Sequence, residues 1–185
     1  MEKINEKIAV ALLKRQTHSS YRYIIRHAKK VAQVATKIAR QVQKKHEVNI
    51  GFVKTASLLH DIGRHICPPF DRKKSPFHGV EGAKILREYG LEKHARAAER
   101  HLGGGIDRKE ARKIGLEKGV YLPKTTEEKI VCYADKLVAD EKKIPIQKSI
   151  DRFRNEIGRD SAERIRKLHN ELVKMGMKGR RIDTK

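Results

Sequence analysis

The chain has 185 residues, which is enough for one ordinary domain with a substantial hydrophobic core. Its 44 Lys and Arg outnumber its 23 Asp and Glu, and the formal net charge of +21 favours anionic partners such as nucleotides, nucleic acid or an acidic membrane surface. No run of about 18 apolar residues occurs and the two cysteines form no CxxC pair, so the composition argues against a transmembrane helix, a disulfide framework and a cysteine zinc site.

Helical spacing of apolar residues recurs along the whole chain, and no alternating strand pattern persists. The first helix is expected over residues 2–15, in a charged N-terminus that lacks the apolar region and cleavage site of a signal peptide. We therefore expect a cytoplasmic protein without a membrane segment. The later helices are expected over residues 21–45, 50–62, 78–89, 92–101, 126–140, 148–157 and 161–175.

The helix over residues 21–45, with a candidate cap at Ser19 or Ser20, has an apolar and a basic face. A solvated helix face usually mixes both signs of charge to gain i,i+4 pairs, yet residues 20–45 contain no acid. The basic face is therefore predicted to attract anions; the alternative is that the charge only keeps the protein soluble. The apolar face is formed by Ile24, Val31, Val34, Ile38 and Val42, and the basic face by Arg22, Arg26, Lys29, Lys37, Arg40 and Lys44.

One all-α domain is predicted, because neither an internal repeat nor a low-complexity linker divides the chain. Proline at 68–69 and glycine at 103–105 mark loops between helices. We assign residues 1–175 to the domain and residues 176–185 to a basic C-terminal tail that is a candidate for fraying.

Two helices carry a polar residue where an apolar residue is expected. His27 continues the apolar face of its helix, and Asp135 is in register with Val131 and Val138. A carboxylate that faces the core costs several kcal/mol unless it is paired or binds a metal. The ordinary alternatives are a hydrogen-bonded core histidine at position 27 and an ion pair for the carboxylate.

Four further candidate ligands lie at predicted helix ends. His60 and Asp61 are neighbours in LLHDIGRH, where we expect Gly63 to let the chain turn so that both side chains converge. His78 opens one helix and His101 closes another, and each alone could be an ordinary helix-end residue. The four histidines and two aspartates together predict a metal site with nitrogen and oxygen ligands. Such ligands suit Fe, Mn, Mg, Ni or Zn, and Fe or Mn is preferred here.

The remaining histidines are expected to have other roles. His18, His46, His94 and His169 lie at polar helix ends or among charged residues, so all four are predicted on the surface. His65 follows the His-Asp pair closely. For it we prefer a surface position, or support of a metal ligand, to direct metal binding.

The ordered residues His27, His60-Asp61 and Asp135 resemble the ligand pattern H…HD…D of the HD superfamily of metal-dependent phosphohydrolases. The string HDIGR is similar to the frequent HDIG variant of that superfamily. The resemblance extends over residues 27–135 and implies an all-α helical bundle with the metal site between its central helices.

Two more histidines extend the resemblance to branches that bind two metals. His78 in HGVEGAKIL and His101 in ERHLGG, followed by EEKIVCYADKL, are similar to HD-type diadenosine tetraphosphate hydrolases and to HD-GYP cyclic-dinucleotide phosphodiesterases. No GYP motif is present, which argues against HD-GYP activity, and no KH region of the kind found in RNase Y-like enzymes is recognisable. The overall pattern is most similar to small archaeal-type HDIG proteins known as predicted hydrolases.

The resemblance implies a hydrolase of EC class 3.1 or 3.6 that uses two divalent ions. A carboxylate can serve two cations, so Asp61 is expected to bridge them, while Asp135 helps to orient the attacking water. Arg64 is expected to bind a phosphate oxygen, and an ordinary charge at a helix C-terminus is the equal alternative. The expected ligands are His27, His60, Asp61 and Asp135 for one ion, and Asp61, His78 and His101 for the other.

Three functions remain open. The preferred one is cleavage of a phosphoester or phosphoanhydride bond in a nucleotide or a similar small phosphorylated metabolite. The alternatives are a phosphodiesterase or nuclease that acts on RNA or single-stranded DNA along the basic face of helix 21–45, and a non-catalytic metal-bound module that binds nucleic acid. Aromatic residues make up only 5% of the chain and Trp is absent, so base-stacking platforms are not obvious and a small substrate is favoured.

Overall fold

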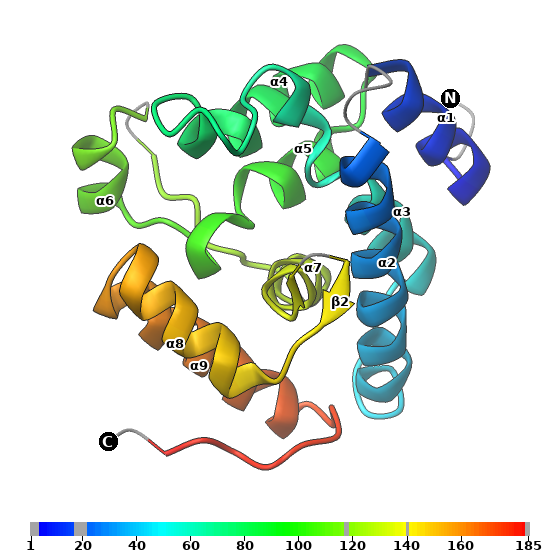
Figure 1. The fold of residues 1–185 in the computed structure, drawn as a ribbon. Coiled ribbons are helices and arrows are strands. Elements are labelled where there is room, and N and C mark those ends of the chain that lie inside the picture. The colour runs from blue at the N-terminus through cyan, green and yellow to red at the C-terminus, as the bar shows by residue number, and fades with distance from the viewer. Residues whose placement is uncertain (1–3, 17–21, 117–118, 140, 184–185) are drawn as a thin grey trace.

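The structure, a computed structural model, describes residues 4–16, 22–116, 119–139 and 141–183. The described chain is helical apart from a small antiparallel sheet of β1 (Val138–Ala139) and β2 (Lys142–Lys143), which confirms the predicted all-α class (Figure 1). The α-helices are α1 (Glu6–Gln16), α2 (Arg22–Val42), α3 (Ile50–Leu59), α4 (His78–Glu88), α5 (Glu92–Glu99), α6 (Arg108–Lys113), α7 (Thr126–Lys136), α8 (Ile146–Glu156) and α9 (Arg159–Lys174). Short 3-10 helices are η2 (Ile62–His65), η3 (Ser75–Phe77) and η4 (Leu102–Gly104).

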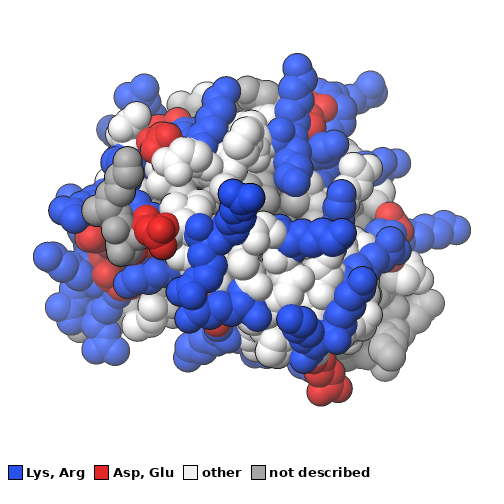
Figure 2. All heavy atoms as spheres, turned by 90° about the horizontal axis from the view of Figure 1, so that it is seen from below, with Lys and Arg blue, Asp and Glu red and all other residues white. Residues whose placement is uncertain are grey.

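Helix α2 is the longest element, and it packs against α3 and α7. Its predicted apolar face is buried and its predicted basic face is exposed. Each buried Val or Ile contributes roughly 1.5–3 kcal/mol, so the apolar face holds this helix in place. On the face seen from below, Lys and Arg side chains far outnumber acidic ones (Figure 2).

The buried apolar residues form two main clusters that both include α2. One cluster joins α2 to α1, α3, α4 and α5, and it contains Ile24. The other joins α2 to α3, α7 and α9, and it contains Val31. His27 lies between Ile24 and Val31 on the same helix, so this candidate ligand is held where the two clusters meet.

Cys67 and Cys132 are buried free thiols. Over the ranges that the structure describes, no helix combines the length and the apolar character that crossing a bilayer requires.

Helix α7 ends one turn earlier than predicted. Ser149 Oγ donates a hydrogen bond to the Lys136 carbonyl at 2.6 Å, and the Ile144 N–H donates to the Leu137 carbonyl at 2.8 Å. These partners take carbonyls near the C-terminus of the helix, and the chain continues into β1. The prediction of a helix over 126–140 is therefore wrong in its last turn.

Helix α6 was not predicted. Its N-cap, Asp107, accepts hydrogen bonds from the backbone N–H groups of Lys109 and Glu110, and the Glu110 side chain bonds back to the Asp107 N–H. This capping box stabilises a helix of only six residues. The sequence DRKE contains the signal, but the segment is too short for apolar periodicity to reveal it.

Two of the four histidines predicted on the surface are buried, and for these the prediction was wrong. His94 lies 2.9 Å from Thr55 Oγ1. The ring of His169 bridges Tyr133 Oη at 2.6 Å and the Arg180 carbonyl at 2.9 Å. Their charged sequence neighbours point elsewhere, because adjacent residues of a helix lie about 100° apart.

Of the other two surface histidines, only one can be assessed. His46 is exposed, as predicted. His18 and the candidate caps Ser19 and Ser20 lie outside the described residues.

The basic tail is attached to the domain over residues 176–183. Met177 is 7% exposed and belongs to the core cluster shared by α2, α7 and α9. The Asn170 side chain forms two hydrogen bonds of 2.8 Å with the backbone N–H and carbonyl of Ile182. The expectation of fraying was therefore wrong for the described part of the tail.

Gly63 is required for packing and not for a left-handed turn. Its φ is not positive, so the turn expected at this glycine does not depend on a left-handed backbone conformation. A Cβ at this position would lie 2.2 Å from the His78 carbonyl oxygen and 2.5 Å from the Gly82 backbone nitrogen. The missing side chain allows η2 to approach α4 closely, which brings the segment after α3 beside His78.

We expect Gly63→Ala to lower the free energy of unfolding by about 3 kcal/mol, because the new methyl group overlaps backbone atoms that cannot move aside. Urea unfolding followed by circular dichroism measures this loss. Gly51→Ala is the matched control, since its Cβ would meet only Asn49 Oδ1 at 3.4 Å and alanine favours a helix. Equal stability of the two variants would contradict the packing role.

The free energy of unfolding should decrease as the pH falls from about 6.5 to about 4, partly because burial lowers the pKa of His94 to about 4. In this window the unfolded chain binds a proton that the folded His94 does not, so protonation favours unfolding. His94→Gln should therefore reduce the pH dependence of the unfolding free energy, measured with urea at pH 7 and pH 5. An unchanged pH dependence in His94→Gln would refute the assignment.

Candidate metal centre

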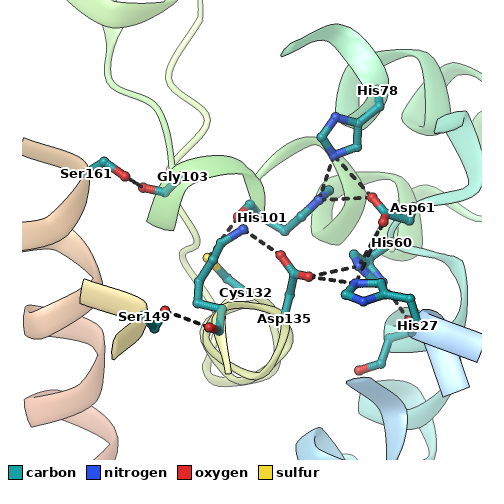
Figure 3. A network of polar contacts seen from close by, with 12 residues as sticks. His27, His60, Asp61, His78, His101, Gly103, Cys132, Asp135, Ser149 and Ser161 are labelled. Carbon is teal, nitrogen blue, oxygen red and sulfur yellow. Dashed lines mark hydrogen bonds and ion pairs between the residues drawn. The ribbon is translucent and has the colours of Figure 1, made fainter. Parts of the chain in front are cut away.

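All six predicted ligand side chains converge on one small space between the central helices (Figure 3). They come from segments far apart in the sequence, and each ligand atom lies close to several others. The residues are His27 of α2, His60 and Asp61 after α3, His78 at the start of α4, His101 after α5, and Asp135 of α7.

Asp61 lies at the middle of the group. Its Oδ1 is 3.2 Å from His78 Nε2 and 3.5 Å from His101 Nε2. Its Oδ2 is 3.6 Å from His60 Nε2 and 3.8 Å from His27 Nε2. Each carboxylate oxygen thus faces a different pair of histidines, which is the arrangement a carboxylate shared by two cations requires.

The adjacent residues His60 and Asp61 reach the same space because α3 ends at Leu59. His60 retains helical dihedral angles as the C-cap, whereas Asp61 has φ −101° and ψ 16°. The values for Asp61 lie in the bridge region between helix and strand, where many active-site residues are found. This break in the helix removes the angular separation that a continuous helix would impose on neighbours.

Backbone carbonyls select the tautomer of three of the histidines. In each, Nδ1 lies within hydrogen-bond distance of the carbonyl three residues earlier, and a carbonyl can only accept. The proton is therefore on Nδ1, and Nε2 presents its lone pair to the centre, as a metal ligand must. The pairs are His60–Ser57 at 2.7 Å, His78–Ser75 at 2.6 Å and His101–Ala98 at 2.6 Å.

The Nε2 atoms lack partners that would satisfy them without a cation. His60 Nε2 is fully buried and has no hydrogen bond. His78 Nε2 and His101 Nε2 lie 3.0 Å apart, and two lone pairs cannot hydrogen-bond to each other. A buried polar atom without a partner costs about 1–3 kcal/mol, so the donor set fits a bound metal ion.

Asp135 uses its two oxygens differently. Oδ1 is 3.0 Å from His27 Nε2 and 3.4 Å from His60 Nε2, whereas Oδ2 is 2.5 Å from Lys136 Nζ. Lys136 is 3% exposed, and its ammonium lies 5.0 Å from the centroid of the Phe153 ring. The lysine therefore pairs with Oδ2 of Asp135, and Oδ1 faces the histidines of the cluster.

Sequence reasoning missed Lys136. The only signal is a lysine directly after the predicted ligand in ADKL, and the helical pattern suggests that such a neighbour points away. Because α7 ends at this residue, its side chain can turn back to the carboxylate.

The protonation states of Asp61, Asp135 and His101 suit metal binding at neutral pH. Burial opposes ionisation of Asp61, but the Arg64 guanidinium outweighs it and holds the pKa of its carboxyl well below the usual range. Burial lowers the pKa of His60, but the carboxylates of Asp61 and Asp135 outweigh it and raise this pKa, so metal binding at His60 competes with a proton. Burial likewise opposes ionisation of Asp135, and Lys136 reverses the effect and lowers its pKa. Burial lowers the pKa of His101 to about 3. The carboxylates are therefore charged and His101 is neutral, the forms in which these groups bind metals.

Arg64 is hydrogen-bonded beside the ligand cluster. Its Nε donates to Asp61 Oδ1 at 3.2 Å, and its Nη1 donates to Ser75 Oγ at 2.9 Å. His65 is oriented differently: its Nδ1 lies 2.9 Å from the Ile62 carbonyl, and the ligand cluster does not include it.

A cavity of about 630 Å³ opens beside the six side chains. This volume lies within the range of sites that hold small molecules. The cations Arg64, Lys136 and Arg152 line it, together with Phe153 and Ile157 from α8 and the residue that follows it. Helix α8 and Ile157 therefore form one wall of the space in front of the candidate metal centre.

The HD domain family model matches residues 24–140, a range that contains all six side chains. An uncharacterised protein of Methanocaldococcus jannaschii is 40% identical over 153 residues, which cover 80% of this chain and 87% of that protein. This archaeal relative agrees with the archaeal group suggested by the sequence. The similarity to diadenosine tetraphosphate hydrolases remains a prediction.

Two longer proteins also match. A tRNA (cytidine(56)-2'-O)-methyltransferase of Thermoplasma volcanium is 40% identical over 151 residues, which cover 81% of this chain but 42% of that protein. The protein of the same name from Picrophilus torridus is 39% identical over 150 residues, which cover 80% and 41%. The chain thus spans less than half the length of these methyltransferases.

Solved structures support the fold. The HD domain of the Listeria monocytogenes phosphodiesterase PgpH is 16% identical, with a TM-score of 0.52 and coverage of 86% of this chain and 94% of that chain. The same domain in complex with cyclic-di-AMP gives a TM-score of 0.53 at 16% identity, with coverage of 86% and 93%. The HD-domain fold implied by the sequence resemblance is confirmed.

We expect Mn²⁺ to raise the melting temperature of the metal-stripped protein, since a ligand that binds only the folded state adds about 2.7 kcal/mol at a hundredfold excess over its Kd. Asp61→Asn should lose most of this shift, because both groups of histidines lose the shared carboxylate. His65→Ala, four residues away and outside the cluster, is the control and should keep the shift. Equal Mn²⁺ effects in the two variants would contradict the assignment of Asp61.

Proposed function

Because this chain belongs to the HD domain family, we propose that it is a metal-dependent phosphohydrolase that acts on a nucleotide or a similar small phosphorylated metabolite. The bond cleaved is a phosphoester or phosphoanhydride, which corresponds to EC class 3.1 or 3.6. The observation that carries the proposal is the position of Asp61, whose two oxygens face two separate pairs of histidines. The PgpH domain bound to cyclic-di-AMP, a nucleotide, supports the substrate class by analogy of fold.

The centre would hold two divalent ions, with Fe or Mn preferred and Mg, Ni or Zn as alternatives, because only nitrogen and oxygen donors are present. When bound, such ions supply an activated water for attack on phosphorus and neutralise charge on the phosphate. The proposed ligands are His27, His60, Asp61 and Asp135 for one ion, and Asp61, His78 and His101 for the other.

Arg64 is the proposed phosphate-binding residue. Its Nε and Nη1 bond to Asp61 and Ser75, which hold the guanidinium in one orientation at the cavity wall. Its remaining N–H groups can donate to a phosphate oxygen, and such charge-assisted hydrogen bonds are about twice as strong as neutral ones. Because the guanidinium is fixed before substrate binds, little side-chain entropy is lost on binding.

Asp135 is proposed to orient the attacking water. Lys136 Nζ holds its Oδ2, so rotation of the carboxylate is restricted and Oδ1 stays beside His27 and His60. Lys136 and Arg152 line the cavity wall, but Glu141 and Glu156 line it too, so the side chains alone do not make it a positively charged site. Bound metal ions would supply the additional positive charge that neutralises an anionic substrate.

A phosphodiesterase acting on RNA or single-stranded DNA is the second candidate. The cavity at the metal centre shares wall residues, among them Ser75 and Ile157, with a second cavity of about 610 Å³. Lys109, Lys113 and Arg159 line the second cavity together with acidic residues such as Glu110 and Asp160, so a substrate longer than a mononucleotide would meet further cations there, interspersed with carboxylates. The two relatives named as tRNA methyltransferases also associate this kind of domain with RNA enzymes.

The test is turnover by the Mn-loaded protein of nucleoside monophosphates and polyphosphates, dinucleoside polyphosphates and short RNA, followed by chromatography. We expect release of phosphate or a nucleotide from the small substrates. Turnover of RNA alone would favour the second candidate. Bound metal without turnover of any substrate would favour a non-catalytic module.

Two substitutions test the residue roles in the same assay. Asp61→Ala should abolish activity while circular dichroism shows an unchanged helical content. Arg64→Gln should lower kcat about a hundredfold, the usual effect of removing one fixed donor to developing charge. The control is Arg96→Gln, which removes an arginine paired with Glu92 away from the cavity. Activity that survives Asp61→Ala would show that the chemistry takes place elsewhere.

A further inference from the structure

A second basic feature lies away from the candidate metal centre. It is a groove of about 590 Å³ between α2, α7, the segment after β2 and the C-terminal tail. Five cationic side chains line it, and we call it the basic groove. They are Lys30 and Lys37 of α2, Lys143 of β2, and Lys178 and Arg180 of the tail.

The positive charge of the basic groove is not compensated. None of the described residues that line it is acidic, and none of its five cations forms an ion pair with a described residue. Elsewhere on the molecule basic residues do have such partners, for example Arg26 with Glu141 and Lys129 with Glu171. Five like charges around one groove repel each other, so an anion that enters the groove is favoured by all of them.

The wall formed by the tail is fixed before any ligand binds. The Lys178 N–H donates to Gln41 Oε1 of α2 at 2.9 Å. The Arg180 carbonyl accepts a hydrogen bond of 2.9 Å from Nε2 of the buried His169, whose Nδ1 accepts from Tyr133 Oη at 2.6 Å. The backbone that carries Lys178 and Arg180 is thus held at both residues, and binding does not have to order it.

Helix α7 separates the basic groove from the metal centre. Tyr133 lines the basic groove, whereas Asp135 lines the cavity beside the candidate metal centre. Residues two apart on a helix differ by about 200° in direction, so the two sites lie on opposite sides of α7. A ligand in the groove therefore does not need the metal centre.

We propose that the basic groove binds the phosphodiester backbone of nucleic acid. A strand of regularly spaced phosphates can lie in a groove lined by five cations, whereas a flat membrane surface cannot enter it. Among the described lining residues, the only aromatic rings are those of Tyr133 and His169, and both are buried. The described lining therefore offers no exposed platform for base stacking. Recognition is therefore of the backbone and independent of base sequence. This function goes beyond the proposed hydrolysis and does not depend on it.

The test is fluorescence anisotropy with a labelled 20-nucleotide single-stranded RNA, titrated with the full chain at several salt concentrations. The combined variant Lys37→Gln, Lys143→Gln and Lys178→Gln should bind more weakly. Its slope of log Kd against log salt should fall by about two, since each neutralised contact to a single strand contributes about 0.7. A DNA strand of the same length shows whether the groove distinguishes deoxyribose from ribose, and an RNA duplex shows whether it distinguishes double from single strands. Binding of either supports recognition of the backbone.

The matched control removes the same charge from the opposite side of the fold, by Lys7→Gln, Lys14→Gln and Lys93→Gln in α1 and α5, which carry exposed lysines. It should retain the affinity and the salt slope of the unmodified chain. Asp61→Ala should also retain them, which separates groove binding from the proposed hydrolysis. Loss of binding in either control, binding to anionic vesicles with the same dependence on Lys37, Lys143 and Lys178, or no binding to any strand would overturn the proposal.

Discussion

The carboxylate of Asp61 is the interaction on which the arrangement of the centre depends. It is nearly buried among four histidine rings and Arg64, and the guanidinium of Arg64 offsets part of the cost of removing its charge from water. Three of those rings are locked by backbone carbonyls, so their Nε2 atoms cannot turn away. Backbone hydrogen bonds therefore help to hold these ligand atoms in place, which keeps the cost of organising them low.

The packing of the helices positions the residues that surround this carboxylate. Helix α3 ends just before it, and Gly63 lets η2 contact α4 backbone to backbone, which brings His78 next to Asp61. The apolar face of α2 holds His27 at the junction of two core clusters. A ligand set drawn from separate helices thus shares the rigidity of the core, because close-packed interiors do not deform to accommodate misplaced side chains.

The large positive charge is divided between different environments. Arg64 and Lys136 are paired with the carboxylates of the centre, where they lower the carboxyl pKa values and line the cavity. The cations of the basic groove have no acidic partner among the described residues. One sign of charge therefore supports two kinds of anion binding: recognition of a phosphate group in a cavity, and attraction of a polyanion along a groove.

The sequence by itself determined the helical class, the position of most helices and the six candidate ligands, because apolar periodicity and the spacing of His and Asp are local or ordered along the chain. Only the tertiary structure decided how Asp61 divides its oxygens between histidine pairs, that Lys136 turns back to Asp135, and that His94 and His169 are buried. It also placed the tail beside α2 and so created the basic groove. The physical reason is the same in each case: these contacts join residues that are distant in sequence or lie at helix ends, where periodicity no longer fixes the direction of a side chain.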